Sequence, residues 1–109
     1  MRNRYKLPSH LRNYIKNELY DYKKNKKKIK EIQPTDTSTR TLLIATQRIQ
    51  NIETVFNNLS ADEKEIAEKI FFEKCNRVYM ETQYYITKDI YYNIMNKVIY
   101  LVAKKLDLF

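Results

Sequence analysis

The sequence predicts an all-α protein of about five helices. The chain of 109 residues contains no glycine, the residue on which most tight hairpins and phosphate-cradling loops depend. Apolar residues recur at spacings of three and four along much of the chain, which is the period of an amphipathic helix. Together these observations argue against a phosphate-binding loop, a dinucleotide-binding turn and sheets joined by glycine turns.

The first predicted helix is long and basic, and it runs from about residue 8 or 9 to residue 32. Pro8 suits the first turn of a helix. Lysines crowd residues 23–30, where like charges four residues apart repel one another. Gln33-Pro34 should end the helix, because a residue before proline is driven out of the helical region. The expected apolar stripe is Leu11, Ile15, Leu19, Tyr22, Ile29 and Ile32.

Four further helices are expected after a polar linker at 35–39. The second covers about 39–58, and the third covers 61–74. Ser60 and Glu63 have the spacing of a capping box at the start of the third. Asn76 can cap a short helix over 77–84, and Thr87 can cap the last helix over 88–106. The expected apolar face of the last helix is Ile90, Tyr91, Ile94, Val98, Leu101, Val102 and Leu106.

The net charge lies entirely in the first third of the chain. Residues 1–32 carry eleven Lys and Arg against three acids, a net charge of +8, and the remaining residues sum to zero. We therefore expect a basic helical arm at 1–34 and a helical domain at 35–109. A basic arm on a neutral body favours a polyanionic partner, which is nucleic acid first and an anionic membrane surface second.

Several classes of function are disfavoured by the composition. One histidine, His10, and one cysteine, Cys75, cannot supply the four ligands of a structural zinc site. No nucleophile and base pair is evident, so we expect no enzyme, no catalytic residue, no metal and no cofactor. A lone cysteine, the lack of a long apolar run and the lack of a signal-peptide core lead us to expect a soluble cytoplasmic protein.

Residues 76–106 have the element lengths of a helix-turn-helix, the motif in which a second helix enters the DNA major groove. That second helix needs a polar cap, a buried face that locks it to the first helix, and an exposed polar face. Thr87 fits the cap. The buried face would be Ile86, Tyr91, Ile94 and Val98. The exposed face would be Lys88, Asp89, Tyr92, Asn93, Asn96 and Lys97.

These residues carry a resemblance to a known family. The segment from Leu59 to Phe72 resembles the opening of a sigma-factor region-4-like domain. The segment 86–93, read as ITKDIYYN and followed by Lys97-Val98 and a leucine-ended tail, is similar to the recognition helix of phage late-gene transcriptional activators of the RinA/ArpU type. Residues 11–14 and 49–59 look like the preceding helices of the same family.

Three positions depart from the pattern of that family. Glu81 stands where the family has a small alanine, and a one-residue shift would offer Thr82 instead. The turn carries Tyr84-Tyr85 in place of a small residue, and Asn93 replaces an arginine of the recognition helix. We expect these departures to alter base reading more than the shape of the domain.

The resemblance implies a sequence-specific DNA-binding regulator of transcription in a bacterial host cell, with double-stranded DNA as its partner. Base edges would be contacted by Lys88, Tyr92, Asn93 and Asn96, and Asn93 is the best candidate for a bidentate contact to adenine. Phosphates would be held by Arg77, Thr87, Lys97, Lys23, Lys24, Lys26, Lys27, Lys28 and Lys30.

Two alternatives remain open at this point. The apolar stripes of the first two helices could pair with a second copy of the chain, with RNA polymerase or with a phage protein, which would make the protein an interaction module. Residues 8–32 could instead lie on a membrane surface. The lack of Trp and Phe on that apolar face argues against the membrane.

Overall fold

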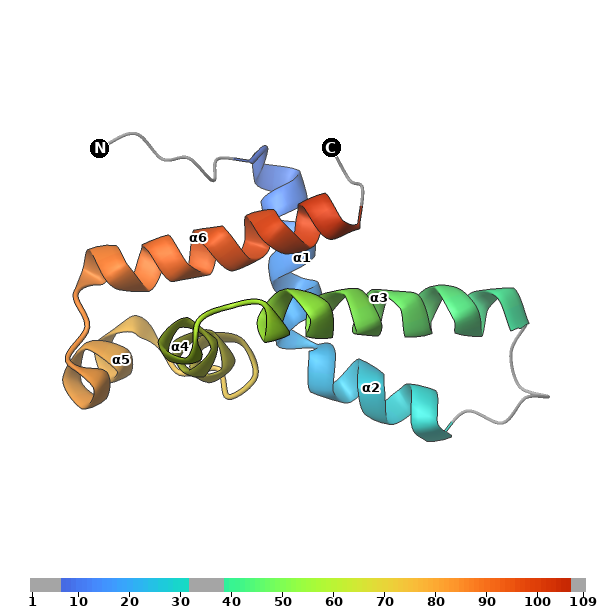
Figure 1. Cartoon of the computed structure of the whole chain (residues 1–109), viewed down its shortest axis with the longest axis horizontal. Coiled ribbons are helices and arrows are strands. Elements are labelled where there is room, and N and C mark those ends of the chain that lie inside the picture. Colours follow the sequence, from blue (N-terminus) through green and yellow to red (C-terminus); the bar gives the residue numbers. More distant parts are fainter. Residues whose placement is uncertain (1–6, 32–38, 107–109) are drawn as a thin grey trace.

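Residues 7–31 and 39–106 are described by a computed structural model, and within these ranges the chain forms six α-helices (Figure 1). The all-helical class predicted from the sequence is therefore confirmed. The expected break at Gln33-Pro34 and the linker at 35–38 lie outside the described residues. The helices are α1 (Ser9–Tyr20), α2 (Tyr22–Glu31), α3 (Thr39–Asn57), α4 (Ala61–Phe71), α5 (Arg77–Tyr84) and α6 (Lys88–Lys105).

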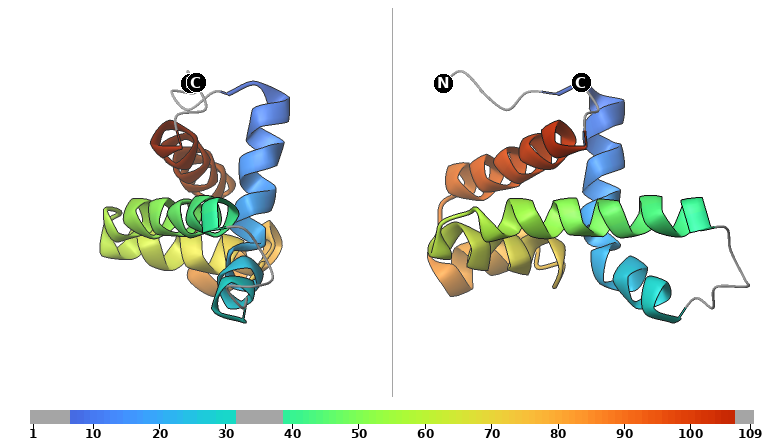
Figure 2. Two further views of the ribbon diagram at one scale, coloured as in Figure 1. Left: turned by 90° about the vertical axis from the view of Figure 1, so that its right-hand side faces the viewer. Right: turned by 45° about the vertical axis from the view of Figure 1, so that its right-hand side comes forward.

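The long first helix of the sequence prediction is divided at Asp21. This residue has φ −92° and ψ 6°, outside the helical region, and α2 leaves it in a new direction (Figures 1 and 2). Asp21 still donates its N–H to the carbonyl of Asn17 at 3.0 Å and accepts from the N–H of Asn25 at 2.8 Å. The bend lets α1 pack against α6 while α2 packs against α3, which one straight helix could not do.

A single apolar core joins all six helices of the described chain. Helix α6 lies at its centre, because it contacts α1, α3, α4 and α5. Each buried aliphatic or aromatic side chain stabilises the fold by about 1.5–3 kcal/mol relative to its exposed state. The core residues are Ile15, Leu19, Tyr22, Ile49, Ile52, Val55, Phe56, Ala67, Ile70, Phe71, Met80, Tyr91, Ile94, Met95, Val98, Ile99, Val102 and Ala103.

Three helix starts carry the side-chain caps that the sequence predicts. Ser60 and Glu63 form both bonds of a capping box, with the Glu63 N–H donating to Ser60 Oγ at 3.2 Å and the Ser60 N–H donating to Glu63 Oε1 at 3.3 Å. Asn76 Oδ1 accepts from the N–H of Tyr79 at 2.8 Å, and Thr87 Oγ1 accepts from the N–H of Ile90 at 3.1 Å. Each cap satisfies a backbone donor that the helix leaves unpaired.

The predicted apolar face of α6 is wrong at one position and too narrow. Ile90 is 43% exposed, because it lies in the first turn, at the edge of the core. Met95, Ile99 and Ala103 are buried although the prediction omitted them. A helix surrounded by four others buries a wider face than the single stripe expected of a helix at the surface.

Candidate nucleic-acid interface

Helices α5 and α6 are joined by three residues, Tyr85 to Thr87, and pack against one another. Met80 of α5 and Tyr91 of α6 are buried in the common core and fix the second helix relative to the first. Tyr85 has the left-handed conformation, with φ 55° and ψ 31°, and its side chain is 90% exposed. A tyrosine therefore holds a backbone conformation for which glycine is the usual residue.

The start of α6 presents a polar face to solvent. Lys88, Asp89, Tyr92 and Asn93 are all exposed. Asp89 and Asn93 lie opposite the buried residues of α6, whereas Lys88 and Tyr92 lie nearer to the buried face. The Thr87 cap uses a lone pair of the hydroxyl oxygen, so the O–H remains a donor that could reach a phosphate. Lys88 stands beside Asp89, which leaves this face with little net charge.

Two of the expected DNA-contacting residues of α6 are held by other helices. Asn96 Oδ1 accepts a hydrogen bond from Nη1 of Arg12 on α1. Lys97 Nζ lies 2.8 Å from Glu63 Oε2 on α4, and this hydrogen bond lowers the pKa of the Glu63 carboxyl. Both side chains therefore link α6 to other helices, whereas Lys88, Tyr92 and Asn93 are exposed.

Arg77, expected at a phosphate, lies at the first position of α5 and faces Glu81 one turn later. The Arg77 Nε and Glu81 Oε2 atoms are 4.0 Å apart, and both side chains are about a third exposed. Glu81 thus occupies the position of the family's small alanine without entering the core. Thr82, the alternative at that position, is exposed and donates its hydroxyl to the carbonyl of Val78 at 2.9 Å.

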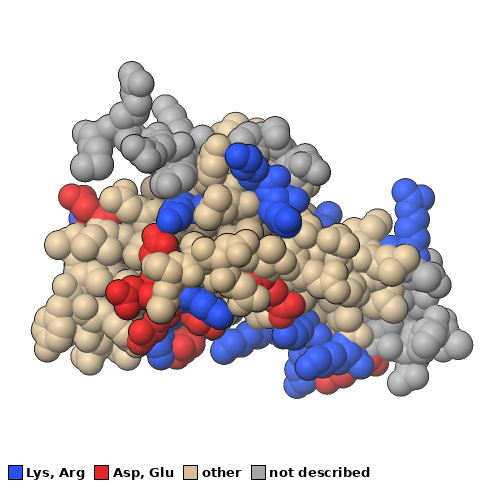
Figure 3. Space-filling view, in the orientation of Figure 1, with Lys and Arg blue, Asp and Glu red and all other residues tan. Residues whose placement is uncertain are grey.

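The lysine tract lies on α2, away from α5 and α6. Figure 3 shows a group of basic side chains below α3, around α2, while other basic side chains of this face lie above α3 and at the right-hand side of the view. Lys27 faces Glu31 at 4.0 Å, but both side chains are mostly exposed, so the pair contributes little. The five exposed lysines of the tract are Lys23, Lys24, Lys27, Lys28 and Lys30.

The sixth lysine of the tract, Lys26, has a structural contact instead. Its Nζ lies 2.6 Å from Glu53 Oε2 on α3, and Tyr22 donates its hydroxyl to the same oxygen at 2.5 Å. The hydrogen bond with Glu53 raises the pKa of Lys26, and the same bond lowers the pKa of Glu53. Burial, followed by the Glu53 contact, raises the pKa of Tyr22. Lys26 therefore holds α2 against α3.

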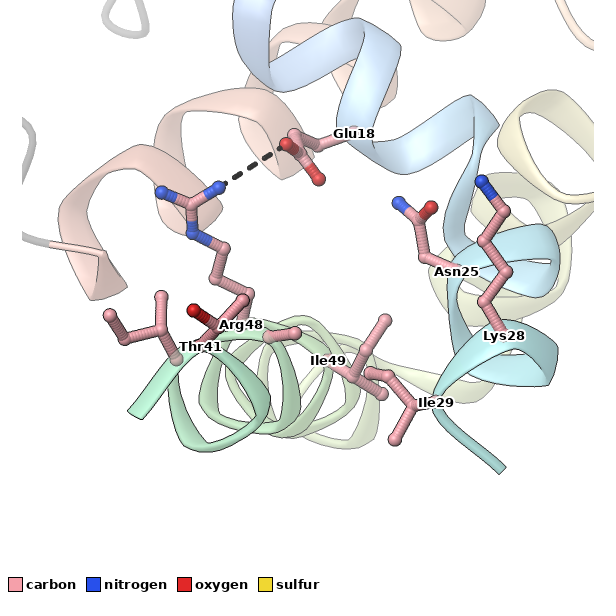
Figure 4. Close-up of a pocket in the computed structure, with 9 residues that line it drawn as sticks. Glu18, Asn25, Lys28, Ile29, Thr41, Arg48 and Ile49 are labelled. Carbon is pink, nitrogen blue, oxygen red and sulfur yellow. Dashed lines mark ion pairs between the residues drawn. The ribbon is translucent and has the colours of Figure 1, made fainter. Parts of the chain in front are cut away.

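A groove of about 380 Å³ separates α1 and α2 from the first half of α3. Figure 4 shows Arg48 on α3 reaching toward Glu18 on α1, with 3.5 Å between Arg48 Nη1 and Glu18 Oε1. Ile29 and Ile49 approach one another from α2 and α3 at its apolar side. Ile44 on α3 lines the groove and is 48% exposed, and Leu43, which does not line it, is 64% exposed. No local signal in the sequence indicates this groove, because its walls come from distant segments.

No group of three His, Cys, Asp or Glu side chains is placed to hold a metal among residues 7–31 and 39–106. No helix in those same ranges is long and apolar enough to span a bilayer. His10 is exposed at the start of α1 and Cys75 is a half-buried free thiol.

Comparison with known proteins gives no match, since no family model, no curated protein and no solved structure is significantly similar to the chain. The resemblance to phage late-gene activators therefore rests on the motifs quoted from the sequence. Membership of that family stays a prediction.

Proposed function

We propose that the protein binds double-stranded DNA in a sequence-dependent way and regulates transcription. The observation that carries the proposal is the exposure of Lys88, Tyr92 and Asn93 on one side of the capped start of α6, behind a three-residue turn from α5. A helix presented in this way is the element that enters the major groove in helix-turn-helix proteins. The role in transcription comes from the resemblance to phage activators.

In this mechanism Asn93 reads the sequence. A carboxamide both donates and accepts, which matches the N6 and N7 atoms of adenine, and a bidentate pair discriminates against other bases by about 1–3 kcal/mol. Asn96 is less suited to this role, because its Oδ1 already accepts from Arg12. Lys88 can donate to guanine or to a phosphate, and the Tyr92 hydroxyl can do either.

The lysines of α2 supply affinity without sequence preference. Each lysine that neutralises a phosphate releases a condensed counterion, so binding weakens steeply with salt. Lys26 is not counted among them, since Glu53 neutralises it. Arg77 and Lys97 face Glu81 and Glu63, so their contribution to phosphate binding is smaller than that of an unpaired cation.

The test is a selection of bound sites from random duplexes, followed by titration over a salt series. Asn93→Ala should lower the ratio of specific to non-specific affinity by about 5- to 150-fold, the equivalent of one base contact. Lys23→Gln with Lys27→Gln should weaken the non-specific binding of duplexes and reduce the salt slope of that binding by about 2, without changing which site is enriched. The matched control changes Lys104 and Lys105, exposed at the other end of α6, to Gln. Absence of any enriched site would contradict sequence-specific binding.

A second candidate is a protein-interaction module. It is favoured by Ile44, which lines the groove between α2 and α3 and is 48% exposed, and by its neighbour in the chain, Leu43, which is 64% exposed. In this case the groove would receive a second copy of the chain, RNA polymerase or another protein, and α5 and α6 would be scaffold. Sedimentation velocity over a range of concentrations, with wild type and Ile44→Ser, separates the two candidates. Self-association that Ile44→Ser abolishes, without any DNA binding, would favour the module.

A further inference from the structure

The two candidate DNA surfaces lie on opposite sides of the molecule. Helix α3 contacts both α2 and α6, and it lies between them in every view (Figures 1 and 2). The described chain extends 49 Å along its longest axis. Figure 1 shows α2 toward one end of that axis and the start of α6 toward the other.

Part of the lysine tract on α2 lies away from the contact with α3. Its inner side is marked by Tyr22, which is buried, and by Lys26, which is bound to Glu53 of α3. Lys23, Lys27 and Lys30 are spaced by four and three residues, so they share one exposed stripe of the helix. This stripe faces away from α3 and therefore away from α6.

Helix α6 likewise directs its polar start away from the body. Its buried residues, including Tyr91 and Ile94, face the helices that it contacts. Asn93 lies on the other side, Tyr92 lies at the edge of the buried face, and Lys88 is exposed as the first residue of the helix. The two surfaces thus point in different directions, with the apolar core between them.

A short DNA duplex cannot easily reach both surfaces. Duplex DNA has a persistence length of about 150 base pairs, and bending a site of 20–30 base pairs by 40–90° costs about 1–6 kcal/mol. Helix α4 lies between the two surfaces in Figure 1 and carries the acids Asp62, Glu65 and Glu68 beside Lys64 and Lys69, so it offers no purely basic path that would offset this cost.

We propose that one molecule bridges two DNA segments, with α6 on one duplex and the lysine stripe of α2 on another. The inference rests on the proposed DNA binding and extends it. The α6 surface would hold the segment that carries a specific site. The stripe of Lys23, Lys27 and Lys30 would hold any second segment through its phosphates, with strong dependence on salt.

The test is retention of a fluorescent 24-base-pair duplex by an immobilised duplex that contains the selected site. The salt concentration is about 0.1 M, where each phosphate contact contributes nearly tenfold to the binding constant. Full-length wild-type protein should retain the second duplex. Lys23→Gln with Lys27→Gln should reduce retention at least tenfold while binding to the immobilised site persists. Lys88→Gln with Asn93→Ala should also reduce retention, and Lys104→Gln with Lys105→Gln should leave it unchanged.

The outcomes separate this inference from the proposed function. Binding to the immobilised duplex without retention of the second would overturn bridging and leave DNA binding intact. Retention that survives the Lys23 and Lys27 changes would also overturn it, because the second duplex would then be held by another surface or by a second copy. Failure to bind any duplex would overturn both proposals.

Discussion

Lys97 Nζ on α6 lies 2.8 Å from Glu63 Oε2 at the start of α4. The same carboxylate accepts the Ser60 N–H through its other oxygen at 3.3 Å. Glu63 therefore takes part both in a helix cap and in an interhelical ion pair. Since the pair neutralises Lys97, α4 limits how much positive charge α6 can offer to a phosphate.

The two roles of Glu63 can be separated by substitution. Glu63→Gln keeps an oxygen that can accept from Ser60, so the capping box persists and only the ion pair is lost, at a cost of about 0.5–1 kcal/mol for a partly exposed pair. Glu63→Ala loses both and should cost about 1–2 kcal/mol. Urea unfolding of the two variants measures the difference. Equal destabilisation by both changes would contradict the separate contribution of the cap.

The Glu63 contact also makes stability depend on pH. The hydrogen bond with Lys97 lowers the pKa of the folded carboxyl below its ordinary value of 4.5. The stabilisation is therefore complete well above pH 4.5 and is lost as the pH falls through the lower pKa of the folded state. The gap in unfolding free energy between wild type and Glu63→Gln should shrink from about pH 7 to about pH 3.

A control variant tests whether the loss of one negative charge accounts for this pH dependence. Glu65→Gln removes an exposed carboxylate from the same helix, and its difference from wild type should stay nearly constant over that range. Glu53→Gln should behave like Glu63→Gln, because the hydrogen bond with Lys26 lowers the pKa of Glu53. A gap that widened toward acid pH for Glu63→Gln would show that the pKa shift has the opposite sign.

The helix starts after residue 59 could be predicted because their signals are local. The end predicted for the third helix is wrong, since the helix ends at Phe71 and not at residue 74, and Lys74 has a left-handed φ of 56° that an α-helix cannot contain. A cap such as Asn76 or Thr87 acts within three residues, so its chemistry is legible in the sequence. The α5 range of 77–84 follows from this directly. The break at Asp21 could not be predicted in the same way, since the apolar stripe continues through it and only packing on two different helices requires it.

The contacts of the candidate site residues could not be predicted from the sequence either. Asn96 and Lys97 have the helical position of exposed groove-reading residues, but Arg12 and Glu63 hold them from elsewhere in the chain. In the sequence Lys26 does not differ from the other lysines of the tract, but in the structure it forms an ion pair with Glu53. Such pairs join distant segments, and no periodicity within one helix indicates them.

Tyr85 should be a site where glycine stabilises the protein. Its φ of 55° places a residue with a Cβ in the left-handed region, which costs roughly 1–2 kcal/mol, and glycine removes that cost while adding some chain entropy. We expect Tyr85→Gly to raise the free energy of unfolding by about 1 kcal/mol. Tyr85→Ala is the matched control, because it removes the same exposed ring and keeps the Cβ. Stabilisation by alanine equal to that by glycine would assign the effect to the ring.

Leu19 tests whether α1 belongs to the same folding unit as α6. The side chain is fully buried at 0% exposure in the core shared by all six helices of the described chain. Leu19→Ala should destabilise the protein by about 2–5 kcal/mol, the usual cost of a cavity in a packed core. Leu43→Ala, at a site 64% exposed, should change the free energy of unfolding by less than about 0.5 kcal/mol. Because α1 supplies core residues, circular dichroism and tyrosine fluorescence should report one coincident transition for both variants. A separate early transition, with the rest of the helix signal unchanged by Leu19→Ala, would instead assign residues 9–31 to an independent arm.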